Sequence, residues 1–304
     1  MFDQIIGNLS VLTAAPIFAV DLLFQGLFIG AIFALAGYGL ALVWGVMNVK
    51  NLAQGDLVIL GGYIAFQLAA WGVHPVVALP IAFVVMFAFG WGIYVLIIRR
   101  VVERDLFTSL LATFGLSLLI QQTLNRIYGP EVQVVESGLG SREFADGLMI
   151  VPDVRILSLV LASVLATGII VFMRYSRMGQ AIRATSQDAR AARVLGIDTD
   201  RVYSFTYALN SAICGATGVL VALIWVIQPF YGIVYSIRAF IIVTAAGLGN
   251  LPGVIFTGFG LGIAEKYSDF VLGSEFAIAA VVLFLVFVLI WRQIQMYRVR
   301  QVVR

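Results

Sequence analysis

Long apolar runs constrain this chain more than any other feature of its sequence. Several of them approach 20 residues, which is enough for a helix to cross roughly 30 Å of hydrocarbon. Of the 304 residues, 62% are hydrophobic and only 12% are charged, which is too little charge to cover a water-soluble protein. A membrane β-barrel would instead show alternating residues in runs of about ten. The sequence therefore predicts an all-α polytopic membrane protein whose first partner is the lipid bilayer.

The apolar segments predict about eight or nine transmembrane helices. They fall at 20–47, 52–72, 75–98, 106–127, 155–173, 202–227, 232–248, 251–268 and 275–291. Lys and Arg accumulate in cytoplasmic loops. The loops at 99–105 and 174–201 and the C-terminal tail are basic, whereas the loop at 128–154 carries five acids, among them Asp146. We expect a single transmembrane domain over residues 1–304, with a cytoplasmic loop at 174–201, a periplasmic loop at 128–154 and the N-terminus outside. Nine crossings bring the basic tail inside, and eight remain possible if the first or last pair does not fully span.

Two of the apolar stretches are interrupted. Polar residues crowd positions 48–56, and Pro252 lies among glycines in 245–262. Irregular backbone in a membrane is tolerated only where protein or a watery cavity satisfies it. One interruption in each half is typical of internally repeated transporters, whose path lies at the repeat interface. The alternative is short loops between ordinary helices, packed through GxxxG pairs. Those pairs are Gly26/Gly30, Gly249/Gly253 and Gly258/Gly262.

Candidate residues for a translocation path come from these interruptions and from one asparagine in the segment 202–227. They are Asn48, Gln54, Asp56, Asn210, Gly249 and Asn250. Asn210 has a second interpretation, as a helix–helix hydrogen bond worth about 1 kcal/mol. The charge-based topology puts Lys50 and Asp56 near the cytoplasmic surface, where a charge costs little.

The basic loop at 174–201 reads as two short helices, over 178–186 and 188–196. Asp188 is a good N-cap for the second helix, and Gly196 is a good C-terminal stop. Ala189, Ala192 and Leu195–Gly196 form one small, smooth face with arginines beside it. Such a face suits contact with another protein, because Arg forms forked hydrogen bonds with carboxylates. An amphipathic helix lying on lipid headgroups is the alternative.

Three stretches resemble one family of proteins. The run RAAxxxG at 190–196 has the spacing of the EAAxxxG loop of bacterial ABC importer permeases, with Arg190 in place of Glu. The wider string YSRMGQAIRATSQDARAARVLGIDTDRV resembles the same loop in the branched-chain amino acid permease family. NLAQGD at 51–56 is similar to that family's NFAHGD/E segment, and RAFIIVTAAGLGNLPGVIFTGFGLGIAE at 238–265 is similar to its C-terminal half. The resemblance covers residues from about 20 to 290, in the family's order.

The resemblance implies an ABC importer permease of the bacterial inner membrane. Its partners would be separate ATPase subunits, an identical or paralogous permease subunit in a dimer, and a periplasmic substrate-binding protein. The loop at 174–201 would hold the helices that couple the permease to the ATPase. The residues expected to carry this coupling are Gly179, Arg183, Asp188, Ala191, Ala192 and Gly196. Branched-chain or other amino acids are the leading substrates, with urea, short amides or aromatic acids as alternatives, because Gln54 replaces the family's usual His.

Other classes of protein fit less well. The sequence has no HExxH, GxSxG or Cys–His arrangement, and its one histidine is His74, so we expect no enzyme, metal site, cofactor or nucleic-acid partner. A Walker A motif is also absent, since neither lysine follows a glycine. Energy must therefore come from another polypeptide or from an ion gradient. The alternative is an ion-coupled secondary transporter, for which the candidate carboxylates are Asp21, Asp56, Glu265 and Asp269.

Overall fold

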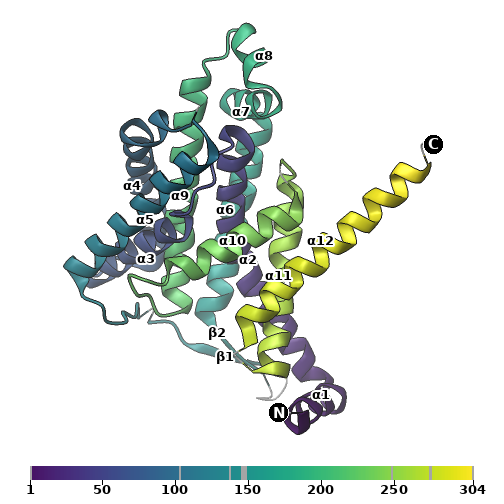
Figure 1. Ribbon diagram of the computed structural model, residues 1–304. Coiled ribbons are helices and arrows are strands. Elements are labelled where there is room, and N and C mark those ends of the chain that lie inside the picture. Colours follow the sequence, from purple (N-terminus) through teal and green to yellow (C-terminus); the bar gives the residue numbers. More distant parts are fainter. Residues whose placement is uncertain are drawn as a thin grey trace.

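The computed structural model describes residues 2–302 except 103, 137, 145–148, 248 and 274–275, so Asp146 of the acidic loop lies outside the described residues. The chain is helical almost throughout this range (Figure 1). In order, the elements are α1 (Phe2–Ala14), α2 (Pro16–Met47), α3 (Gln54–Ala70), α4 (Pro75–Leu96), η1 (Ile98–Arg100), α5 (Leu106–Tyr128), β1 (Ser141–Phe144), β2 (Met149–Pro152), α6 (Asp153–Tyr175), α7 (Arg177–Gln187), α8 (Ala189–Val194), α9 (Thr199–Ile224), α10 (Gly232–Ala246), α11 (Leu251–Leu272) and α12 (Ala277–Val302).

Each predicted apolar segment corresponds to one helix in the described part of the chain. Among the described residues, five helices are long and apolar enough to cross a membrane: α2, α4 with η1, α5, α6 and α9. Two shorter apolar helical stretches follow, α10 and residues Val281–Trp291 of α12. The all-α polytopic class is confirmed, while the number of full crossings stays a prediction.

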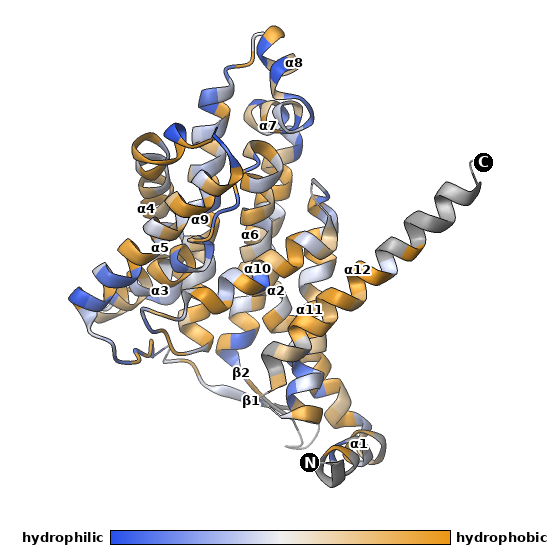
Figure 2. Ribbon diagram, viewed as in Figure 1, coloured by the Kyte–Doolittle hydropathy of each residue, from blue (hydrophilic) through white to orange (hydrophobic). Residues whose placement is uncertain are grey.

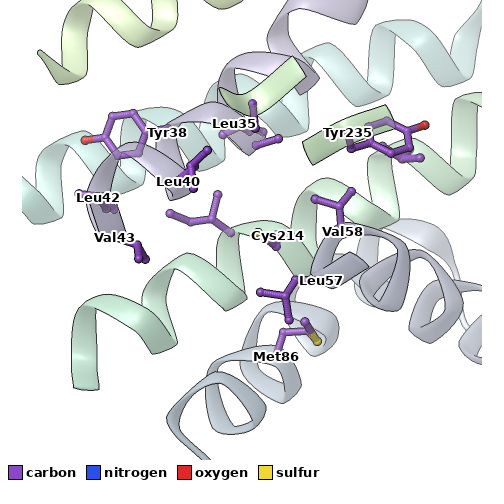
Figure 3. Close-up of a cluster of buried hydrophobic side chains, with 14 of the residues drawn as sticks. Leu35, Tyr38, Leu40, Leu42, Val43, Leu57, Val58, Met86, Cys214 and Tyr235 are labelled. Atoms are coloured by element: carbon purple, nitrogen blue, oxygen red, sulfur yellow. The ribbon is translucent and has the colours of Figure 1, made fainter. Parts of the chain in front are cut away.

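The core of the molecule is built around α2 and α9. In their most apolar windows 89% and 94% of residues are buried, whereas the figure is 33% or less in α4, α5 and α6. A helix that is apolar on all sides is expected inside a bundle or in lipid. Figure 3 shows the resulting cluster, where Leu40, Leu57, Met86 and Cys214 come from α2, α3, α4 and α9. Cys214 is fully buried, as its apolar surroundings in the sequence predict.

Glycines let α2 and α11 pack backbone to backbone. A Cβ atom at Gly26 would stand 2.6 Å from the Cα of Ile263, and one at Gly30 would stand 2.7 Å from the Cα of Phe259. Gly258 and Gly262 face the same contact from α11. The predicted close packing at these two glycine pairs is therefore confirmed.

The third glycine pair has a different role. Gly249 lies in the turn before α11 with φ +81°, and a Cβ at Gly253 would meet the side chain of Asn250 rather than another helix. The GxxxG interpretation is wrong for this pair, because these residues end one helix and begin the next.

Two loops mark opposite ends of the molecule. Helices α7 and α8 of the basic loop lie at one end, and α1 lies at the other together with the hairpin β1–β2 (Figure 1). The hairpin is antiparallel, with Ser141 paired to Pro152 and Phe144 to Met149, and the sequence pattern did not predict it. Opposite ends are what the charge distribution predicts for a cytoplasmic and a periplasmic loop.

Candidate functional site

The basic loop consists of two capped helices. The Ser176 hydroxyl accepts a hydrogen bond from the backbone N–H of Gly179 at 2.8 Å and begins α7. The Asp188 carboxylate accepts from the N–H groups of Ala191 and Arg190, at 3.0 and 2.8 Å, and begins α8. These bonds lower the pKa of Asp188, because they favour its charged form. Gly196 follows α8 with φ +85°. Both predicted helix-end roles, for Asp188 and for Gly196, are confirmed.

Helix α7 is anchored to the ends of the long helices. It packs against α2, α6 and α9. Its inner face consists of Gly179, Ile182 and Thr185, all buried. A Cβ at Gly179 would meet the backbone oxygen of Met173 in α6 at 2.5 Å. Gly179 therefore permits the close packing of α7 on the protein itself and presents no surface to a partner.

Helix α8 turns its small face inward. Ala192 is only 3% exposed, whereas Val194 and Leu195 at the tip are 87% and 81% exposed. The prediction that Ala192 lies on the outer contact face is wrong, because its side chain is buried. The physical reason is that α8 packs against α7 and the start of α9, and a small side chain fits that contact. Of the other residues chosen for coupling, four are exposed: Arg183, Asp188, Ala191 and Gly196.

The surface of the basic loop therefore carries both polar and apolar side chains. Figure 2 shows hydrophilic residues gathered along α7 and α8, while the middle of the molecule is hydrophobic. At the base of the loop, Arg193 donates to the Thr199 hydroxyl at 2.6 Å. Asp200 accepts from Tyr94 at 2.7 Å and lies 3.1 Å from Arg99. The Arg193 bond ties α8 to α9, and the two Asp200 contacts tie the start of α9 to α4 and η1. The exposed side chains of Val194 and Leu195, with arginines beside them, form a surface that suits contact with another protein.

Two amide side chains, Gln54 of α3 and Asn210 of α9, meet in the interior of the helix bundle. The Gln54 Nε2 donates to Asn210 Oδ1 at 3.1 Å and to the backbone oxygen of Ala36 at 2.9 Å. Both amide side chains are fully buried. Asn210 is eleven residues after Thr199, the first residue of α9, or about 16 Å along the helix at 1.5 Å per residue. Since α9 has 26 residues, this is close to its midpoint.

Asp56 also lies inside the protein. It is 1% exposed, and its Oδ1 accepts from Gln121 Nε2 at 2.9 Å. It is only two residues after Gln54, which lies level with the middle of α9. The placement of Asp56 near the cytoplasmic surface is therefore wrong. The reason is that the segment 48–53 folds back into the molecule, so that α3 begins inside it.

The first interruption, at 48–53, is satisfied by side chains from distant helices. Asn48 ends α2 in the left-handed region with φ 55°. The backbone N–H of Leu52 donates to the Thr113 hydroxyl at 3.2 Å, and its oxygen accepts from the Ser236 hydroxyl at 3.0 Å. The Ser236 hydroxyl also accepts from the N–H of Gly55 at 2.8 Å. This is the condition under which irregular backbone is tolerated at membrane depth.

The second interruption is the turn between α10 and α11, and it lies beside the end of α2. Gly247 and Gly249 have φ of +89° and +81°, and Asn250 caps α11 by accepting from Gly253 N–H at 3.1 Å. The N atom of Gly249 would be 3.8 Å from a Cβ at Gly45. The structure therefore divides the six path candidates. Gln54, Asp56 and Asn210 are buried in the middle, while Asn48, Gly249 and Asn250 are exposed at the end of α2.

One charged pair could not be predicted from the sequence. Arg238 of α10 and Glu265 of α11 form a bidentate ion pair, with Nε 3.0 Å from Oε2 and a second bond from Nη2 to Oε1. Their side chains are 14% and 13% exposed. The signal available in the sequence was the presence of Arg238 in one apolar segment and of Glu265, next to Lys266, in another. It could not reveal that the two helices bring those charges together.

A bundle of apolar helices with buried polar interruptions and an anchored basic loop defines a polytopic membrane transport protein. The sequence matches the family described as "Branched-chain amino acid transport system / permease component" over residues 22–291, and the chain belongs to that family. It is thus a permease component, a transport subunit that crosses the membrane several times.

Curated relatives agree with this assignment. The chain is 30% identical over 271 residues to the high-affinity branched-chain amino acid transport system permease protein LivH of Escherichia coli (strain K12), covering 84% of this chain and 87% of that protein. It is 27% identical over 284 residues to BraD of Pseudomonas aeruginosa, covering 89% and 92%. A probable LivH of Methanocaldococcus jannaschii is 27% identical over 248 residues, covering 80% and 78%. No solved structure matches the chain significantly.

Proposed function

We propose that this chain is the membrane permease subunit of an ABC importer in a bacterial inner membrane. It moves branched-chain or other amino acids, and separate subunits hydrolyse the ATP. The relatives named as branched-chain amino acid permeases support the substrate class. The observation that carries the mechanism is the basic loop, which projects from one end and is anchored on three long helices.

The anchoring offers a mechanical route from an ATPase to the path. Movement of α8 is passed to α7 through their contact, and α7 packs directly on α2 and α9. The Gln54 amide at the start of α3 donates to the Ala36 oxygen in α2 and to Asn210 in α9, and α2 leads directly into the interruption at 48–53. A push on the basic loop thus reaches the middle of the molecule through packed helices.

The carboxylates argue against an ion-coupled secondary transporter. A proton carrier needs a carboxylate that can exchange its proton with water on both sides. Glu265 is held by Arg238, and Asp269 lies 3.2 Å from Lys266 Nζ. Asp21 accepts from Gln25 at 2.7 Å. Asp56 is enclosed. These partners make the four carboxylates poor carriers, which favours an external source of energy.

Reconstitution tests the proposal. The chain would be placed in proteoliposomes with its ATPase subunits, a permease partner and the substrate-binding protein, and uptake of labelled L-leucine, L-phenylalanine and urea would be compared. We expect amino-acid uptake that requires ATP and the ATPase subunits. Uptake by the chain alone, driven by a proton or sodium gradient, would overturn the proposal.

A further inference from the structure

A cavity of about 270 Å³ lies between α2, α10 and α11, beside the end of α9. Its walls include Phe33, Trp225, Tyr235, Arg238 and Glu265. Ligand pockets in proteins span roughly 300–1,000 Å³. The volume of this cavity lies just below that range, which suits a small ligand such as an amino acid.

The charged wall of this cavity has unused bonding capacity. Arg238 donates from Nε and Nη2 to Glu265, and from Nη1 to the Val234 backbone oxygen at 3.3 Å. A guanidinium has five N–H donors, so two remain beyond these three bonds. Each Glu265 oxygen accepts one of the bonds, and a carboxylate offers about four acceptor sites. The pair can therefore keep its own bonds while Arg238 receives a carboxylate and Glu265 receives an ammonium group.

Aromatic side chains line the same cavity beside the charged pair. Phe33 and Trp225 are stacked, with ring centroids 6.4 Å apart and an interplanar angle of 11°. The Arg238 guanidinium lies 5.0 Å from the Phe33 ring centroid, so charge and apolar surface meet within the same cavity. Ile29 adds an aliphatic side chain. An aliphatic or aromatic side chain of a ligand would find apolar contacts at this wall.

The cavity faces the end opposite the basic loop. Trp225 and Val226 follow the last residues of α9, and the next residue, Ile227, forms a β-bridge with Gln133 of the acidic loop. The N–H of Gln133 donates to the Ile227 oxygen at 2.8 Å, and the N–H of Ile227 donates back at 3.0 Å. On the charge-based topology this is the periplasmic end, where a binding protein would release its substrate.

Helix α10 joins the cavity to the interruption at 48–53. Its residues Tyr235 and Arg238 line the cavity, while Ser236 between them bonds to Leu52 and Gly55. A ligand that moves α10 would thus act on the start of α3. A buried ion pair is weak evidence of stabilisation, because the desolvation of both charges offsets much of their attraction. Charges among transmembrane helices more often mark a substrate pathway.

We propose that this cavity binds the zwitterionic head of an α-amino acid during transport. Arg238 holds the carboxylate, Glu265 holds the ammonium group, and Phe33 with Trp225 receives the side chain. The inference rests on the proposed function and assigns its substrate site to the outer part of α2, α10 and α11.

Binding of L-leucine to the complex assembled in nanodiscs without the substrate-binding protein tests the proposal, with saturation-transfer NMR as the readout. We expect Arg238→Gln and Glu265→Gln each to weaken binding about tenfold or more, because each loses a charge-assisted contact. 3-Methylbutylamine lacks the carboxylate and 4-methylpentanoate lacks the ammonium group, so neither should displace leucine at equal concentration.

A second pair of variants guards against misfolding. Val234→Phe fills the cavity without replacing either charged residue, and Ile233→Phe makes a matched change at a neighbouring residue that is 61% exposed. We expect the first to abolish leucine binding and uptake and the second to leave both intact. Unchanged leucine uptake in Val234→Phe would overturn the proposal.

The charge-exchange variant separates a structural from a binding role. Arg238→Glu combined with Glu265→Arg restores the ion pair but reverses the charges that meet the ligand. Full recovery of uptake would show that the pair is only structural and would overturn the site. If the wild-type complex takes up amino acids while the cavity variants change nothing, the site fails and the proposed function stands. Absence of ATP-dependent amino-acid uptake in the wild-type complex would instead refute the proposed function.

Discussion

The glycine contact between α2 and α11 gives a sharp test of the packing. An alanine Cβ at Gly262 would stand 2.5 Å from both the Gly26 backbone oxygen and the Gly30 Cα. At Gly260, two residues earlier on the same helix, the nearest atom is the Phe284 Cζ at 3.8 Å. Gly262→Ala and Gly260→Ala therefore add the same methyl group, the first at a position without room for it and the second at a position with room.

The expected difference follows from contact distances. Carbon atoms pack comfortably at about 3.5–4.0 Å, so an alanine at 262 must move the two helices apart by about 1 Å. Such overpacking costs about 1–3 kcal/mol. Both variants share the gain of about 1 kcal/mol in helix propensity when Gly becomes Ala. The propensity gain cancels in the comparison, which leaves Gly262→Ala less stable than Gly260→Ala by about 1–3 kcal/mol.

Thermal unfolding of the purified protein in detergent measures this difference. Gly260→Ala should match or exceed the wild-type melting temperature. Gly262→Ala should melt several degrees lower, since 1 kcal/mol shifts the midpoint by roughly 2–4 °C in chains of 150–250 residues. Equal melting temperatures for the two variants would show that the helices are not packed backbone to backbone.

Three further predictions concern hydrogen bonds and helix ends. Asn210→Leu removes the bond to Gln54 and should cost about 0.6–1.7 kcal/mol in detergent unfolding; no loss of stability would show that the amide bond contributes nothing. Gly196→Ala places a side chain at φ +85°, which costs about 1–2 kcal/mol in the left-handed region; it should speed proteolysis of the basic loop, and unchanged cleavage would count against this conformation. Hydrogen exchange at Ala191 N–H reports the Asp188 cap: because the folded pKa of Asp188 is lowered, its stabilising effect is full above the ordinary value of about 3.9 and is lost as pH falls through the lowered pKa. Asp188→Ala should abolish that pH dependence, and an identical profile in the variant would refute the cap.

The sequence predicts the helices well, because their signals are local. The segment 155–173 lies within α6, and 106–127 differs from α5 by one residue at its end. Asp188 and Gly196 were identified from the chemistry of helix ends, which needs only neighbouring residues. The hairpin β1–β2 gave no such signal, because its two four-residue strands carry no regular alternation.

What the sequence could not predict depends on distant contacts. The segment 48–53 turns inward because Thr113 and Ser236 supply its hydrogen bonds, and these residues are far away in the chain. The face of α8 could be outer or inner from its composition alone, since small residues suit both. Packing against α9 decided that Ala192 is buried. Arg238 and Glu265 meet only because α10 and α11 lie side by side.

Site-specific cross-linking tests whether an ATPase subunit holds the basic loop. The only cysteine of the chain, Cys214, is buried, so Val194→Cys introduces a single accessible thiol at the tip of the loop. Val132→Cys, exposed in the acidic loop, is the matched control. We expect a cross-link from residue 194 to the ATPase subunit in the assembled complex and none from residue 132. A cross-link only from residue 132, or labelling of residue 194 from the periplasm, would contradict it.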